Sequence, residues 1–297
     1  MLNQTHATEP GRTRLPGARR ATGSVGDRRP GRLTYLTLAG VLLFSAFPLY
    51  WTGIVTTHGD RAYTRTPPPL LPGPDLFANA AKVFELSYFG LAMANSFLVA
   101  GGITLAVVLL STLAGFAFAK LRFRGRNALL LTVIGTMMVP TQLGIIPLYL
   151  LMVKLGWTDT LTAVIVPSLV SAFGVFFMTQ YLREALPTEL LEAGRVDGCS
   201  TLRLFWHVVL PAARPAAAVL GMLTFMQAWN DFFWPLVVLT PDNPTVQVAI
   251  SSLAGGLIPD YTVVLTGTVL GTVPLLLVFV LLGRYIVGGI MQGAVKG

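Results

Sequence analysis

Six apolar segments of the sequence are each close to the length that an α-helix needs to cross a membrane, about 20 residues. Only 11% of the residues are charged, whereas about 25% are charged in a typical soluble domain. The segments are residues 33–55, 97–119, 128–153, 161–182, 216–239 and 263–282. Backbone N–H and C=O groups must pair internally in lipid, so helices are the economical structure for them. We therefore predict an all-α membrane protein with six transmembrane helices within residues 33–284.

Lysine and arginine are distributed unevenly between the two sides of the predicted bundle. The side with both termini and the loop 186–211 holds 17 of the 21 Lys and Arg residues. The opposite side holds only Arg61, Arg65, Lys82 and Lys154. Short basic flanks stay in the cytoplasm, so both termini and this loop are predicted to be cytoplasmic.

Residues 1–32 are rich in Arg, Gly, Pro and Thr and show no apolar periodicity. This composition is typical of a disordered segment, and we predict a disordered basic cytoplasmic tail. A cleaved signal is the alternative, because Arg28 and Arg29 precede an apolar segment. That segment is too long for a signal core and has no clear cleavage site. An RNA-binding arm is disfavoured, since no nucleic-acid module follows. Residues 285–297 form a second predicted cytoplasmic tail.

The polar loop 186–211 between the fourth and fifth spans is predicted to contain two short helices joined at a glycine. Thr188 is placed to cap the first helix, and Glu192 follows near its N-terminus, where the helix dipole favours negative charge. Asp197 and Gly198 supply the stop, because glycine readily adopts a positive φ.

The second short helix of this loop is predicted to begin at Ser200, its N-cap, and to continue through Val209. Pro211 is expected to end it, since proline has no backbone N–H to donate. The predicted product is a helix, a glycine corner and a second helix, held against the membrane.

The external segment 56–95 contains five closely spaced prolines, which favour a stiff, extended chain. We predict that residues 75–88, which follow them, form a short surface helix. The spans carry prolines too, and each removes a backbone donor and kinks its helix. In the last span, Gly267 and Gly271 have the spacing typical of a close helix contact. Prolines of this kind include Pro140, Pro147, Pro167, Pro235 and Pro274.

Few polar side chains lie in the predicted spans, and Asp231 is the only ionised residue there. With Gln227 and Asn230 it falls toward the outer end of the fifth span. These three residues are predicted either to line the external mouth of a solute path or to stabilise the helix end. A proton- or sodium-coupled carrier generally needs a charge or an unwound ion site near the midplane, and the sequence shows neither.

Several classes of function are disfavoured by motifs that the sequence lacks. There is no G-x-x-x-x-G-K-[ST] motif, so the chain cannot cradle ATP phosphates itself. Its three histidines are scattered over the tail and two loops, and its single cysteine is Cys199. No metal cluster or catalytic triad can be assembled from these residues. Any energy from ATP must therefore come from another polypeptide.

The loop 186–211 resembles the EAA loop of bacterial ABC importer permeases. That pattern is Glu-Ala-Ala, three residues, Gly, nine residues, Ile, one residue, Leu-Pro. The chain departs at Gly194, which stands for the second Ala, and at Val208, which stands for Ile. The resemblance implies that the loop docks on a separate ATPase and couples its closure to the membrane helices. The candidate coupling residues are Glu192, Ala193, Gly194, Asp197, Gly198, Leu210 and Pro211.

Further motifs are similar to those of the second permease of carbohydrate importers, the MalG-like branch. The resemblance covers essentially everything from residue 33 onward. Its motifs are N-S at 95–96, L-A-G-F-A-F-A-K at 113–120, M-V-P-T-Q and I-I-P-L-Y within 138–149, W-N-D-F at 229–232 and V-K-G at 295–297.

This resemblance implies a type I ABC importer permease fold in the lipid of a bacterial plasma membrane. It implies a MalF-like second permease, an ATPase homodimer that holds ATP and Mg²⁺, and an extracytoplasmic solute-binding protein. No cofactor on this chain and no nucleic-acid partner are expected. The expected solute is a sugar or oligosaccharide; a polyol, a glycerol-phosphate-type solute or a stand-alone secondary transporter are the alternatives. Candidate residues of the solute path are Asn95, Gln142, Gln227, Asn230 and Asp231.

Overall fold

The computed structural model describes residues 31–59, 61–255 and 259–294 of the chain. Within these residues every regular element is a helix, which confirms the predicted fold class. In this described part of the chain, five helices are long and apolar enough to span a membrane, and one bent pair of helices provides a sixth candidate span. The predicted tail 1–32 lies almost entirely outside the described residues.

The candidate spans follow the predicted segments, with different boundaries. The second span, α3 (Phe89–Lys120), begins eight residues earlier than predicted. The last span, α13 (Tyr261–Ala294), continues through residues 285–294, which we had assigned to a tail. The spanning elements are α1 (Arg32–Val55), α3 (Phe89–Lys120), the pair α4 (Arg126–Thr136) and α5 (Ile145–Leu155), α6 (Leu161–Ile165) with α7 (Ala172–Ala185), α10 (Leu210–Trp229), and α13 (Tyr261–Ala294).

The chain divides into two units inside α1, at Pro48. In the first unit, the described part of α1 exposes large apolar side chains, including Leu42 and Phe44. Exposed apolar side chains on a helix of this length are what a lipid-facing span requires.

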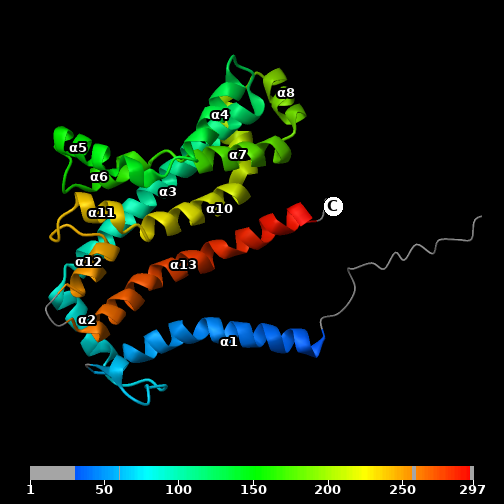
Figure 1. The fold of residues 1–297 in the computed structure, drawn as a ribbon. Helices are drawn as coiled ribbons and strands as arrows, with labels where there is room; N and C mark the ends of the chain where they lie inside the picture. Colours follow the sequence, from blue (N-terminus) through cyan, green and yellow to red (C-terminus); the bar gives the residue numbers. More distant parts are fainter. Residues whose placement is uncertain (1–30, 60, 256–258, 295–297) are drawn as a thin grey trace, which may run out of the picture. The chain divides into compact units, whose positions relative to one another are not determined.

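Helix α3 is the element around which much of the second unit packs. It lies along α7 and α10, and α10 also packs against α13 (Figure 1). One apolar core joins buried side chains of α3, α7 and α10, among them Val107, Met178 and Leu220. A second core around Phe89 and Trp229 joins α3, α10, α13 and the short helix α12 (Val246–Leu253), which we did not predict.

Small residues bring two pairs of helices into close contact. A Cβ atom on Gly115 would lie 2.8 Å from Met178 Cβ and 2.9 Å from backbone atoms of α7. A Cβ atom on Gly271 would lie 2.8 Å from Val246 Cγ1 of α12, and one on Gly267 would lie 3.1 Å from Leu253 Cδ1. The close contact predicted for Gly267 and Gly271 is therefore confirmed, with α12 as the partner.

The third span is not the continuous helix that we predicted over 128–153. Helices α4 and α5 meet at an angle of 88°. Pro140 has φ −60° and ψ 125°, an extended conformation, and proline disfavours the helical region for the residue before it. Figure 1 shows α4 near α7 and α8, whereas α5 lies near α6 and α11 at the other end. The pair therefore forms a broken span.

The fifth span also differs from the predicted helix 216–239. Helix α10 ends at Trp229, and a new helix, α11 (Phe233–Val238), begins after a break of three residues. The Asp231 carboxylate accepts hydrogen bonds from the backbone of Phe233 and Trp234. Polar residues at the break satisfy backbone groups that a continuous helix would pair internally.

Most of segment 56–95 is described, and its predicted short helix is confirmed as α2 (Leu76–Leu86). The buried side chain of Asn79 donates to the carbonyls of Thr56 and His58, at 2.9 and 2.7 Å. Gly73 N donates to Thr57 Oγ1 at 2.7 Å. These bonds attach the proline-rich stretch to the end of α1.

Candidate functional site

The loop 186–211 contains a short helix, α8 (Thr188–Val196), that ends at a glycine corner. Gly198 has φ +77°, as predicted. Its N–H bonds to the carbonyl of Arg195, and the Cys199 N–H bonds to the carbonyl of Gly194. This pair of bonds is the Schellman motif, which closes a helix on a left-handed residue. The corner is therefore a defined structure with a fixed exit direction.

The start of α8 differs from the prediction, since Pro187 is the N-cap residue and Thr188 is the first helical residue. Pro187 has φ −60° and ψ 140°, so the extended conformation of the proline sets the start of the helix. The Thr188 side chain makes no capping hydrogen bond there, and the predicted cap was one residue too late.

The second helix of the loop is longer than predicted. Ser200 caps α9 (Thr201–Leu204) as expected, and its Oγ accepts from Arg203 N at 3.3 Å. The helix then continues through a π-helical turn, η4 (Phe205–Val209), directly into α10. The prediction that Pro211 ends this helix is therefore wrong.

The π-helical turn explains how Pro211 is accommodated. The N–H of Leu210 bonds to the carbonyl of Phe205, five residues earlier, so the hydrogen-bond register has already shifted before the proline. Pro211 follows this turn directly as the second residue of α10, and a local π adjustment is one way in which a membrane helix accommodates a proline. The chain from Thr201 to Trp229 is consequently one continuous helix. Leu210 and Pro211 lie where the loop passes into the membrane helix α10.

One face of the loop is anchored in the main apolar core. Leu191 of α8 and Phe205 and Val209 of η4 are buried with Met178 and Leu182 of α7. The two halves of the loop also touch each other at Gly194, where an added Cβ would overlap the end of the buried Leu204 side chain. Because residue 194 is glycine and has no Cβ, α8 and α9 can approach closely.

The other face of the loop is exposed and partly apolar. Glu192, Ala193, Asp197 and Gly198 are exposed, and the Val196 side chain between them is 87% exposed. Three further large apolar side chains of the loop are exposed, and we did not include them among the candidate coupling residues. Apolar residues in an otherwise polar loop are the signal that could have identified them. They are Leu190, Leu202 and Trp206.

The five candidate solute-path residues lie in different surroundings. Two hollows, beside the α3–α4 corner and between α3 and α9, are lined by other residues. Gln142 is exposed in the turn η2 (Thr141–Gly144), and Gln227 is exposed on α10. Asn230 donates to the carbonyl of Met226 at 2.9 Å, as a helix end requires.

Asn95 belongs to a polar network. Its side-chain amide is buried and donates to Asn243 Oδ1 at 2.9 Å and to the Pro244 carbonyl at 3.0 Å. Asn243 donates in turn to the carbonyl of Asp159, and the Asp159 carboxylate accepts from the N–H and hydroxyl of Thr240. The network ties α3 to two loops, and its other members were missed because they lie far away in the sequence.

Replacing Asn95 by leucine is expected to lower the free energy of unfolding by about 1–3 kcal/mol, because a buried acceptor, the Pro244 carbonyl, and a partly buried one, Asn243 Oδ1, lose their donor. Asn230→Leu is the matched control and should cost less, since Asn230 is exposed and bonds only within its own helix. Thermal unfolding of the purified protein in detergent measures both. If Asn95→Leu unfolds at the same temperature as the unsubstituted protein but needs a higher solute concentration for half-maximal uptake, Asn95 belongs to the solute path.

Within the described residues, no group of three or more His, Cys, Asp or Glu side chains is placed to hold a metal ion. The functional features of the described chain are therefore a folded loop continuous with a membrane helix, a broken span, and exposed polar side chains near the helix breaks.

Residues 108–292 match the family described as "Binding-protein-dependent transport system inner membrane component". The chain is 36% identical over 270 residues to the lactose transport system permease protein LacG of Rhizobium radiobacter, covering 91% of this chain and 97% of LacG. It is 31% identical over 266 residues to the sn-glycerol-3-phosphate transport system permease protein UgpE of Yersinia enterocolitica, covering 86% of this chain and 94% of UgpE.

The fold is similar to that of a solved bacterial ABC transporter involved in the import of the acidic polysaccharide alginate. The TM-score is 0.74 at 23% identity, and the match covers 87% of this chain and 99% of the solved chain. At this identity the likeness shows the fold, which is that of an ABC importer permease. The chain belongs to the family of binding-protein-dependent transport system inner membrane components.

Proposed function

We propose that the chain is one of two permease subunits of an ATP-driven importer for a sugar or oligosaccharide. The observation that carries this proposal is the loop 186–211, which is anchored in the core on one face, exposed on the other, and continuous with α10. An ATPase homodimer, which holds the ATP and Mg²⁺, binds the exposed face. Its closure moves the loop, and the continuous helix transmits the movement to the bundle.

The proposed orientation places the loop and both termini in the cytoplasm of a bacterial cell, because the basic residues gather on that side. The external segment with α2 then faces a solute-binding protein. A second, MalF-like permease completes the path, since exposed polar side chains such as Gln142 and Gln227 need a partner surface in lipid. No cofactor is assigned to this chain.

The choice of solute class rests on two observations. LacG is named for lactose and UgpE for sn-glycerol-3-phosphate, so both a sugar and a glycerol-phosphate-type solute have precedents. A phosphate-bearing solute is recognised by cationic groups. The candidate residues Gln142, Gln227, Asn230 and Asp231 offer amides and a carboxylate, but no cation. This chemistry suits the hydroxyl groups of a neutral sugar, and a polyol is the second candidate.

Reconstitution into vesicles tests the proposal. Vesicles with this chain, the second permease, the ATPase and the solute-binding protein should accumulate sugar only when ATP is supplied on the cytoplasmic face. Omitting any one protein should reduce uptake to the background rate. Accumulation with this polypeptide as the only protein would show that it is a stand-alone transporter. Competition by glycerol phosphate but not by sugars would assign the alternative solute class.

A further inference from the structure

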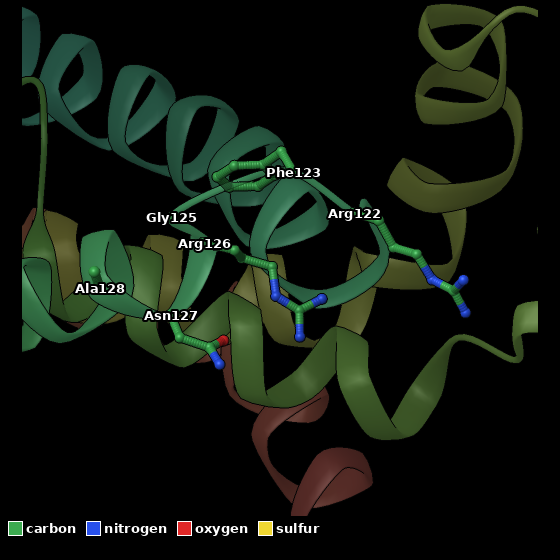
Figure 2. A pocket seen from close by; sticks show the side chains of 6 residues that line it. All are labelled: Arg122, Phe123, Gly125, Arg126, Asn127 and Ala128. Carbon is green, nitrogen blue, oxygen red and sulfur yellow. The ribbon is translucent and has the colours of Figure 1, made fainter.

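The corner between α3 and α4 carries a basic hollow that the proposed import mechanism does not use. The hollow has a volume of about 410 Å³, within the range of small-molecule sites, about 300–1,000 Å³. Gly125 turns the chain at φ +80°, and the side chains project from this turn (Figure 2). The lining residues are Arg122, Phe123, Gly125, Arg126, Asn127 and Ala128.

The charge of this corner is not compensated by the described part of the chain. No carboxylate among the described residues forms an ion pair with Arg122, Arg124 or Arg126, and the first turn of α4 contains no acidic residue. Arg126 Nη1 donates to the carbonyl of Leu121 at 3.3 Å, and Lys120 Nζ donates to the carbonyl of Arg183 at 3.1 Å. The guanidinium groups therefore keep donors for an anionic ligand.

The surroundings of the hollow are those of a membrane surface. Helix α3 ends at Lys120 after a long apolar run, and α4 enters the membrane again after five residues. Phe123 is 41% exposed, and Leu129 and Leu131, both within the first two turns of α4, are 52% and 68% exposed. In Figure 2 the ring of Phe123 points away from the two guanidinium groups. Exposed apolar side chains, which suit the acyl chains of a lipid, thus lie next to arginine side chains, which suit its headgroup.

We propose that this corner binds the phosphate headgroup of an anionic phospholipid, with Arg122 and Arg126 as the cationic ligands and Asn127 as a polar neighbour. Arginine pairs well with phosphate because its planar fork can donate two parallel hydrogen bonds. Basic sites beside membrane helices bind anionic lipid headgroups in this way. The proposal rests on the membrane placement of α3 and α4, but on no property of the solute.

The test uses the complete importer, purified in mixed micelles with equal amounts of phosphatidylglycerol and phosphatidylcholine. After washing, the phospholipid retained by each complex is counted by mass spectrometry. The ratio of phosphatidylglycerol to phosphatidylcholine should fall more than fivefold in Arg122→Gln, because the loss of paired hydrogen bonds to the phosphate adds to the roughly fivefold effect of any basic residue at a lipid surface. Arg124→Gln is the matched control, because it removes the same charge from the same loop without lining the hollow.

Three outcomes would overturn the proposal. Equal losses in Arg122→Gln and Arg124→Gln would show a general surface attraction instead of a site. Displacement of the lipid by millimolar inorganic phosphate would identify a free anion as the ligand. Weaker retention of the ATPase by Arg122→Gln with unchanged lipid would show that the corner binds an acidic protein surface. None of these measurements depends on solute uptake, so a failure here is distinguishable from a failure of the proposed import function.

Discussion

Replacing Gly115 by alanine is expected to lower the free energy of unfolding by about 3 kcal/mol, the upper end of the usual cost of overpacking a core. The new Cβ would lie 2.8 Å from Met178 Cβ and 2.9 Å from backbone atoms of Met178 and Thr179. Backbone cannot rotate aside as the end of a flexible side chain can, so α3 and α7 must move apart. That movement also loosens the neighbouring contact between Ser111 and Gly174.

Gly101→Ala is the matched control for this prediction. Gly101 lies on the same helix, is exposed, and has open space where a Cβ would be added. The same substitution there should leave stability unchanged or raise it by up to about 1 kcal/mol, because alanine is the better helix former. Thermal unfolding of both variants in detergent measures the difference. Equal stability of Gly115→Ala and Gly101→Ala would show that α3 and α7 do not meet at Gly115.

The positions of the spans could be predicted from the sequence, but their shapes could not. Every long apolar segment yielded helix, because lipid leaves the backbone no other partner. The prolines were visible, yet they do not act alike. Pro215 and Pro274 lie inside the continuous helices α10 and α13, whereas α4 and α5 meet at 88° around Pro140. The packing of neighbouring helices decides which proline bends a span, and a single sequence does not contain that information.

In the candidate site too, features set by neighbouring residues could be predicted, whereas contacts between residues far apart in the sequence could not. The glycine corner at Gly198 and the Ser200 cap were predictable, because each depends on residues within one turn. The role of Asn95 was not predictable. Its partner Asn243 is 148 positions away in the sequence, and a polar residue near a span end is equally consistent with a solute path and with helix packing.

Helix α12 was missed for a related reason. Its eight residues are too few to cross a membrane, and they fall between the predicted fifth and sixth spans, where we predicted no element. The helix is stabilised by packing on α3 and α13, where Val246 meets Gly271, and not by any strong local signal. Tertiary contacts of this kind override weak local propensity.

Replacing Gly198 by valine is expected to reduce association with the ATPase at least tenfold while the protein still inserts and folds. A β-branched residue is strained at φ +77°, by at least the roughly 1–2 kcal/mol that a left-handed conformation costs an ordinary residue. The two Schellman bonds at Arg195 and Gly194 break when the corner relaxes. Helix α9 then leaves α8 in another direction, which changes where the exposed Leu202 side chain lies relative to Val196.

Gly156→Val separates backbone strain from the proposed coupling role. Gly156 has φ +67°, is exposed, has open space around its Cα, and ends α5 at the opposite end of the bundle. The variant carries a similar conformational cost, so both variants should lose similar stability in thermal unfolding. Only Gly198→Val should lose the ATPase during co-purification and lower ATP-dependent uptake. If both variants retain the ATPase equally, the corner does not position the docking surface, and the loop would be a passive connection between the fourth and fifth spans.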